Sequence, residues 1–187
     1  MRSGSEVRSR RSVTIHPTAI VHPDAEIGES AEIGPYVCIS GTVKIGPRTI
    51  IGPHVVIEGN TIIGSDNEIF TGAVIGSRTQ DKKFEGGNSY LRIGDRNKIR
   101  EYVTINPGTK EGTETSVGND NLLMAYSHVA HDSVVKDGTV LANVATLAGH
   151  VIVEDRAIIG GLSAVHQFVC IGKLALMRHQ RPAIVVA

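Results

Sequence analysis

The sequence predicts an all-β protein built as a parallel β-helix of hexapeptide repeats, and three observations support this fold class. Every sixth residue from Ile15 to Met177 is aliphatic, except at Asp81, Gly87 and Glu111. Glycine often follows the aliphatic residue, and a small or β-branched residue usually stands four positions after it. Aromatic residues make up only 4% of the chain, which suits a narrow aliphatic interior.

The six-residue period also excludes the simpler folds. An amphipathic helix repeats every 3.6 residues and a half-buried strand every two, so neither accounts for it. In a β-helix each short straight edge points its aliphatic residue inward, and the glycine relaxes the corner that follows. A β-sandwich rich in isoleucine is the alternative, but its strands would need period-two patterning and irregular turn spacing.

Three segments follow from the repeat. Residues 1–12 are polar and rich in arginine, so we expect a disordered leader. Residues 13–177 carry the repeat and are predicted to form one elongated β-helix domain, in which each coil contacts only its neighbours. Residues 178–187 are expected to form a C-terminal tail. Within the domain, residues 13–75 keep the period without a break and are interpreted as scaffold.

Two interruptions predict loops that leave the prism, because the aliphatic phase returns on schedule after each. The first spans 76–92 and contains Gln80, Asp81, Lys82 and Lys83. A loop on a rigid scaffold is a common place for binding residues, and paired lysines can meet a phosphate as point charges. A solvated charged loop explains the same composition equally well. The second interruption, 106–116, is rich in glycine and threonine.

The composition argues against several classes of protein. The formal net charge is zero and no basic face stands out, so we expect no nucleic-acid partner. The two cysteines, Cys38 and Cys170, fall many coils apart, which argues against a disulfide framework or a cysteine metal site and suits a reducing compartment. No apolar run approaches the ~18 residues of a membrane-spanning helix.

From Val117 to Met177 the repeat is unbroken, so positions can be compared between coils. Three six-residue edges close one turn, and residues 18 apart should therefore stack in adjacent coils about 4.8 Å apart. This predicts one column formed by His131, Gly149 and Gln167. The neighbouring column holds Asp132, His150 and Phe168.

These two columns bring together the parts of an acyl-transfer site. A neutral imidazole such as that of His131 can take the proton from an attacking hydroxyl. The carboxylate of Asp132 can hold the imidazole in one tautomer and stabilise the imidazolium. A backbone N–H at Gly149, where no side chain crowds the approach, can stabilise an oxyanion. Because no serine or cysteine lies there as a nucleophile, direct transfer by a general base is favoured.

Four segments resemble a known family. They are GDRNKIREYVTI (94–105), NLLMAYSHVAHD (121–132), LANVATLAGHV (141–151) and IIGGLSAVHQF (158–168). Together they closely resemble the acyl-carrier-protein–UDP-N-acetylglucosamine O-acyltransferases, which begin lipid A biosynthesis. The resemblance implies a left-handed β-helix, a cytoplasmic homotrimer with sites between subunits, and transfer of a 3-hydroxyacyl group from acyl carrier protein to the sugar 3-hydroxyl. It implies neither a cofactor nor a metal.

The resemblance also implies roles for individual residues. The general base falls on His131, the orienting carboxylate on Asp132 and the oxyanion donor on the backbone of Gly149. Substrate contacts fall on six further residues: Gln80, Asp81, Lys83, His128, His150 and Gln167. The chain departs from the family at its end, because relatives continue into a C-terminal helical domain that helps bind the nucleotide and the carrier. The tail is therefore expected to be truncated relative to the family.

Two rival functions stay open. A non-catalytic remnant would fold, form trimers and bind acyl carrier protein without turnover. A zinc hydrolyase of the β-helical carbonic-anhydrase type would gather a metal on His128, His131 and His150. The acyltransferase segments argue against zinc chemistry, in which Asp132 and Gly149 would have no role.

Overall fold

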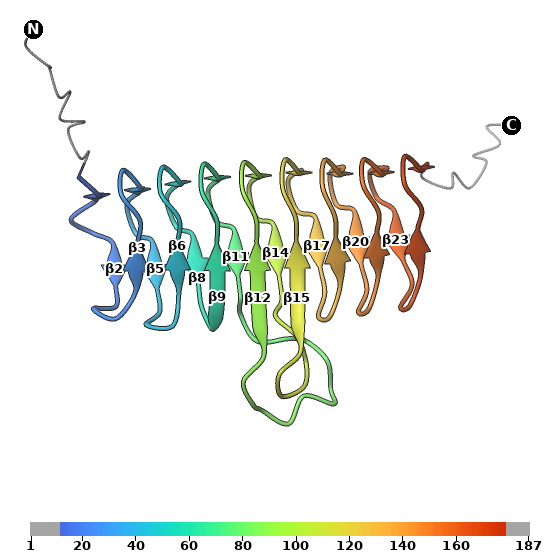
Figure 1. Ribbon diagram of the computed structural model, residues 1–187, viewed down its shortest axis with the longest axis horizontal. Coiled ribbons are helices and arrows are strands. Elements are labelled where there is room, and N and C mark those ends of the chain that lie inside the picture. Colours follow the sequence, from blue (N-terminus) through green and yellow to red (C-terminus); the bar gives the residue numbers. More distant parts are fainter. Residues whose placement is uncertain (1–11, 179–187) are drawn as a thin grey trace, which may run out of the picture.

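The computed structural model describes residues 12–178, which form a left-handed parallel β-helix of short strands, as the repeat predicts (Figure 1). The expected leader lies outside the described residues except for Ser12, and so does the expected tail beyond Arg178. Coils lie side by side along the long axis of the molecule (Figure 1). No described segment forms a helix that could cross a bilayer.

The three faces of the prism are parallel sheets, here named A, B and C. Sheet A contains β1 (Thr14–Ile15), β4 (Glu32–Ile33), β7 (Ile50–Ile51), β10 (Glu68–Ile69), β13 (Lys98–Ile99), β16 (Leu122–Leu123), β19 (Val140–Leu141), β22 (Ile158–Ile159) and β25 (Leu176–Met177). Sheet B contains β2 (Ile20–Val21), β5 (Cys38–Ile39), β8 (Val56–Ile57), β11 (Val74–Ile75), β14 (Thr104–Ile105), β17 (His128–Val129), β20 (Thr146–Leu147) and β23 (Ala164–Val165). Sheet C contains β3 (Glu26–Ile27), β6 (Lys44–Ile45), β9 (Asn60–Ile63), β12 (Tyr90–Ile93), β15 (Glu114–Val117), β18 (Val134–Val135), β21 (Ile152–Val153) and β24 (Cys170–Ile171).

The periodic aliphatic residues fill the interior. Those from Ile33 to Ile171 are buried, and they stack directly on one another because strands pair in register, as Leu123 does with Leu141. Partners are 18 residues apart wherever the coil is uninterrupted. Across the loops the separation grows to 30 or 24 residues, as for Val74 with Thr104 and Thr104 with His128. Each insertion therefore adds a whole multiple of six, which keeps the aliphatic phase.

The two predicted loops leave the prism on the same side and lie next to each other (Figure 1). Both end slightly earlier than the sequence indicates, because β12 already begins at Tyr90 and β15 at Glu114. The extra residues of β12 pair with those of β9 on one side and of β15 on the other, so Tyr90 lies between Asn60 and Glu114. Backbone pairing thus extends the strands past the aliphatic repeat. Cys38 and Cys170 are free, as expected.

Most corners are two-residue turns with a repeating hydrogen-bond pattern. Their second residue usually lies in the left-handed region, for example Asp132 with φ 58° and His150 with φ 60°. The backbone ladder does not need the N–H of the first residue, which explains why this position tolerates proline, as at Pro35 and Pro53. Where the first residue is not proline, its N–H can donate to a side chain instead, as that of Ser65 does to Asp95.

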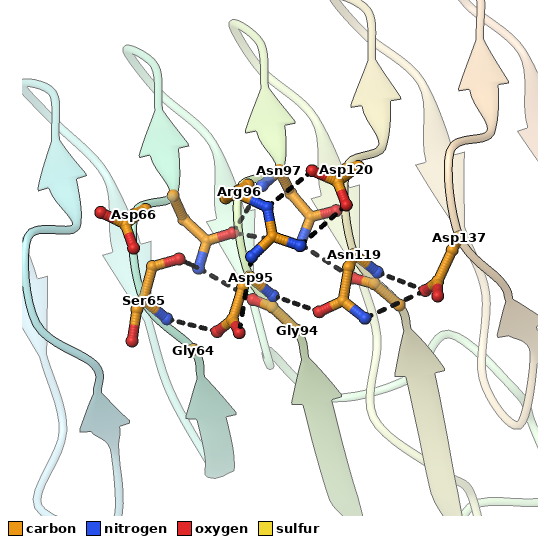
Figure 2. Close-up of polar contacts among 12 residues, drawn as sticks. Gly64, Ser65, Asp66, Gly94, Asp95, Arg96, Asn97, Asn119, Asp120 and Asp137 are labelled. Carbon is orange, nitrogen blue, oxygen red and sulfur yellow. Dashed lines mark hydrogen bonds and ion pairs between the residues drawn. The ribbon is translucent and has the colours of Figure 1, made fainter.

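At the corner between sheets C and A, side chains from the next coil take up these amides (Figure 2). The N–H of Ser65 donates to Asp95, that of Asp95 to Asn119, and that of Asn119 to Asp137, at 2.7–2.8 Å. Two exposed ion pairs, Arg48–Asp66 and Arg96–Asp120, run beside this ladder. The corner is thus closed by its own polar groups, unlike the corner that carries the candidate site.

Candidate active site

The candidate site lies at the corner between sheets B and C, where the two predicted columns form. His131 and Asp132 join β17 to β18, Gly149 and His150 join β20 to β21, and Gln167 follows β23. Consecutive corners are connected through the backbone, because the N–H of His150 donates to the carbonyl of His131 at 3.0 Å. The 18-residue spacing therefore predicts the arrangement that is found.

His131 and Asp132 form a buried pair. Nδ1 of His131 lies 2.8 Å from Oδ2 of Asp132, and their side chains are only 8% and 9% exposed. Burial raises the pKa of Asp132, but hydrogen bonds from His131, Thr113 and Thr109 outweigh it and leave that pKa below its usual value. The carboxylate is therefore ionised near neutral pH and only accepts, so Nδ1 of His131 carries the proton and Nε2 is left as the basic nitrogen.

The first loop closes over this basic nitrogen. Oδ2 of Asp81 lies 3.6 Å from Nε2 of His131, which is too long for a hydrogen bond. The pocket beside it measures about 490 Å³ and is open on one side. Seven of the sequence-predicted residues line it: Gln80, Asp81, Lys83, His128, His131, Gly149 and Gln167. The other two, Asp132 and His150, stand behind His131, outside the pocket lining.

Gly149 lies directly beneath the His131 ring. A Cβ on Gly149 would stand 2.5 Å from Nε2 and 3.0 Å from Nδ1, so any larger residue would displace the imidazole. Gly149 is the first residue of its corner, and within residues 12–178 its N–H donates to no acceptor. The glycine therefore keeps the histidine in place and leaves a backbone donor free beside it.

His128 is the second histidine of the pocket. Its Nδ1 lies 2.7 Å from the hydroxyl of Thr104, its register partner on β14. Burial lowers the pKa of His128 below its usual 6.5, an effect only partly offset by the hydrogen bond to Thr104. His128 is thus neutral near pH 7 and can donate or accept in the pocket.

His150 contacts the His131–Asp132 pair on the side away from the pocket. Its ring makes an edge contact with the His131 ring, with centroids 5.2 Å apart. On its other face it stacks on Phe168, with centroids 4.7 Å apart. Nε2 of His150 also lies 3.8 Å from Oδ2 of Asp132. In this structure His150 therefore contacts the histidine–carboxylate pair.

The second loop supplies contacts that the sequence did not indicate. The backbone N–H of Thr109 donates to the Asp132 carboxylate at 3.2 Å, and the hydroxyl of Thr115 accepts from the Asp132 N–H at 2.7 Å. Thr104 could have been found from its register with His128. Thr109 could not, because loop residues follow no period, and Thr115 lies on the first part of β15, outside the aliphatic repeat.

The three histidines considered for zinc chemistry, His128, His131 and His150, do not form one ligand group in the structure. Among the described residues, His131, Asp132 and His150 offer ligand atoms within 4.8 Å of one another, and His128 is not part of that group. Nδ1 of His128 is engaged by Thr104 instead. The arrangement favours a base held by a carboxylate over three histidines gathered on one ion.

Comparison with known proteins points to one group of enzymes, although no family model matches the chain. The acyl-[acyl-carrier-protein]–UDP-N-acetylglucosamine O-acyltransferase of Janthinobacterium sp. (strain Marseille) is 55% identical over 163 residues, covering 87% of this chain and 62% of that protein. The enzyme of the same name from Gloeothece citriformis is 56% identical over 115 residues, covering 62% of this chain and 42% of that protein. A UDP-N-acetylglucosamine acyltransferase structure from Bacteroides fragilis superposes with a TM-score of 0.83 at 43% identity, covering 90% of this chain and 68% of that one. The chain thus spans between 42% and 68% of the length of these relatives.

Proposed function

The chain belongs to the UDP-N-acetylglucosamine O-acyltransferases, and from this premise we propose that it transfers a 3-hydroxyacyl group from acyl carrier protein to the 3-hydroxyl of UDP-N-acetylglucosamine. This reaction is the first step of lipid A biosynthesis. The observation that carries the proposal is the His131–Asp132 pair, whose basic Nε2 lies in a pocket beside a free backbone amide.

The proposed mechanism is direct transfer by general-base catalysis. Nε2 of His131 takes the proton of the sugar 3-hydroxyl while that oxygen attacks the thioester carbonyl. The Gly149 N–H donates to the oxyanion of the tetrahedral intermediate, and Asp132 stabilises the imidazolium through Nδ1. Collapse of the intermediate breaks the carbon–sulfur bond, and the leaving thiolate takes the proton back from His131. The ester and the carrier thiol are the products, and His131 returns to its neutral form.

The other predicted residues are proposed to hold the substrates. Nε2 of His131 and Oδ2 of Asp81 are 3.6 Å apart, so a sugar hydroxyl lying beside both can donate to one and accept from neighbouring groups. Lys83, on the same loop, is proposed to meet the nucleotide phosphates, with Gln80 beside it. His128, His150 and Gln167 are proposed to make the remaining contacts with the sugar and the acyl chain.

The assembly and partners are proposed from the same premise. We expect a homotrimer in the cytoplasm, with substrate sites between neighbouring subunits and acyl carrier protein as the donor. Because each chain has a mass of 19.9 kDa, a trimer should measure about 60 kDa (3 × 19.9) by light scattering. A monomeric mass at micromolar concentration would contradict this expectation.

The direct test combines the protein with UDP-N-acetylglucosamine and 3-hydroxyacyl carrier proteins of several chain lengths. Mass spectrometry should detect the 3-O-acylated sugar nucleotide. His131→Ala should lower kcat by about 10²–10⁴-fold, the usual effect of losing a general base. His54→Ala is the matched control, since His54 is an exposed histidine at a different corner and stacks on Tyr36. It should retain full turnover.

Two outcomes would favour the rival functions. A folded trimer that binds the carrier but makes no product with any chain length would be a non-catalytic remnant. Stoichiometric zinc in protein purified without added metal, with hydration of carbon dioxide, would indicate the metalloenzyme. Full turnover in the correctly folded His131→Ala protein would remove His131 from the mechanism.

A further inference from the structure

The corners of the β-helix hold one another through a repeated backbone contact. At most corners of the described coils, the second residue donates its N–H to the carbonyl of the first corner residue in the preceding coil. Val144 donates in this way to Ala125, His150 to His131 and Arg156 to Asp137, at 2.9–3.1 Å. This contact fixes the backbone from which the corner side chains project.

Asp132 departs from this pattern. In the preceding coil the second loop replaces the corner between sheets B and C, so no corner carbonyl lies beneath the Asp132 N–H. That N–H instead donates to the side-chain hydroxyl of Thr115, at 2.7 Å. Thr115 is fully buried on β15, with its side chain facing the interior. A side-chain oxygen thus takes the place of the backbone carbonyl, as the hydroxyl of Thr18 also does for the N–H of Tyr36.

We propose that Thr115 is a positioning residue for the reaction: its hydroxyl anchors the Asp132 backbone and thereby holds the carboxylate against Nδ1 of His131. This inference rests on the proposed acyltransferase function for its kinetic consequence, but not for its structural one. The Asp132 carboxylate is also held by hydrogen bonds from Thr109 and Thr113, but these act on the side chain and not on the backbone of the corner. Loss of the Thr115 anchor would let the corner shift, and a misplacement of about 1 Å can lower a rate by about 10²-fold.

The chain offers a closely matched control. Thr61 lies on β9 in the same layer of sheet C, two strands from Thr115 through Leu91, and is also fully buried. Its hydroxyl donates to the carbonyl of Glu58 and does not contact the His131–Asp132 pair. Replacing either threonine by valine removes one buried hydroxyl and keeps the shape. The two valine variants therefore differ chiefly in which backbone group loses its partner.

The experiment compares Thr115→Val, Thr115→Ser and Thr61→Val. We expect Thr115→Val to lower kcat by about 10- to 100-fold with KM nearly unchanged. Thr115→Ser keeps the hydroxyl and should restore kcat. Thr61→Val should lose thermal stability to a similar degree as Thr115→Val but keep wild-type kcat. A merely structural role for Thr115 would affect the two valine variants alike.

A second readout needs no turnover. The proton that His131 Nδ1 shares with Asp132 should give a downfield proton NMR signal, identified by its loss in His131→Gln. We expect this signal in the wild type, Thr115→Ser and Thr61→Val, and its loss or broadening in Thr115→Val. Should Thr115→Val fail to fold, Thr115→Ala takes its place against the serine variant.

The two readouts separate the inference from the proposed function. Persistence of the proton signal and of wild-type kcat in folded Thr115→Val, or in Thr115→Ala, would overturn the inference. A wild-type protein with the signal but without turnover would contradict the acyltransferase proposal, while the signal in the threonine variants would still decide the role of Thr115.

Discussion

At the scale of single residues, the free amide of Gly149 is best understood by comparison with the opposite corner. There an aspartate or asparagine one coil later caps the first-residue N–H of four consecutive coils, those of Ser65, Asp95, Asn119 and Asp137, as Asp137 does for Asn119 at 2.7 Å. The residue in the same relation to Gly149 is Gln167, and its longer side chain makes no such contact with Gly149 in the described structure. A residue of the right length at position 167 would therefore occupy the proposed oxyanion donor.

This comparison predicts opposite effects on stability and rate. Gln167→Asn should cap the Gly149 amide, raise the melting temperature relative to Gln167→Ala, and lower kcat below that of the alanine variant. A lost oxyanion donor is worth about 10²–10³ in kcat, so we expect a difference of at least about tenfold. Both variants lose the glutamine, so that loss cancels in the comparison. Equal kcat values, with the cap formed in a crystal structure of Gln167→Asn, would remove Gly149 from the mechanism.

The lowered pKa of His128 predicts how the stability of the protein depends on pH. Its pKa is lowered in the folded protein, chiefly by burial, so the unfolded chain binds the proton more readily. Both states are neutral above the unfolded value of 6.5, and stability falls as pH drops from there through the folded pKa. His128→Gln cannot titrate, so its melting temperature should fall less between pH 7 and pH 5 than that of the wild type. Parallel curves for the two proteins would contradict this prediction.

At the scale of strands and loops, the sequence predicts the regular parts well. The aliphatic positions place each strand, and the 18-residue interval brings His131 beside Gly149 and Gln167. It could not place Asp81 opposite His131, because the first loop has no repeat from which its path follows. It also could not reveal Thr115 as an anchor, since the need for a substitute acceptor arises only where the second loop removes a corner. The site was thus predictable where it lies on coils and not where it lies on loops.

A row of buried asparagines joins the coils inside the corner between sheets C and A. The side-chain oxygen of Asn97 accepts from the N–H of Asn121, and its amide donates to Asn67 and to the carbonyl of Gly118. Asn97 itself is fully buried. The row of Asn67, Asn97 and Asn121 therefore links three coils through buried side chains.

Removal of one asparagine from this row should lower the free energy of unfolding substantially. Asn97→Ala leaves the buried N–H of Asn121 and one acceptor of Gly118 unpaired, at about 1–3 kcal/mol for each unsatisfied group. We expect a loss of about 2–4 kcal/mol in the free energy of unfolding, measured by chemical denaturation. Asp120→Asn, which removes the charge of the exposed pair with Arg96 at the same corner and tolerates its φ of 57°, should change stability little. A comparable loss in both variants would show that the exposed pair, and not the buried row, holds this corner.

At the scale of the whole molecule, the solenoid makes the cost of a core substitution depend on its position along the axis. Each coil contacts only its neighbours, so an interior coil has two and a terminal coil one. Ile105 stacks between Ile75 and Val129 and is fully buried, whereas Ile15 pairs only with Ile33 among residues 12–178 and is 45% exposed. The two isoleucines occupy the same position in the hexapeptide repeat, on sheets B and A, and differ chiefly in their place along the axis.

Ile105→Ala should therefore destabilise the protein by about 2–5 kcal/mol, because it removes buried methyl groups and leaves a cavity that packed neighbours cannot fill. Ile15→Ala should cost about 1 kcal/mol or less, since nearly half of that side chain already meets water. Denaturant titration of both variants, with equal slopes to confirm two-state behaviour, measures the difference.

The two variants should also differ in catalysis. Ile105 precedes Asn106 in the pocket lining, so its loss should also lower kcat, while the end coil lies far along the axis from His131 and its variant should turn over normally. Equal destabilisation by the two substitutions would mean that the first coil is packed as tightly as the middle, with a further surface covering Ile15.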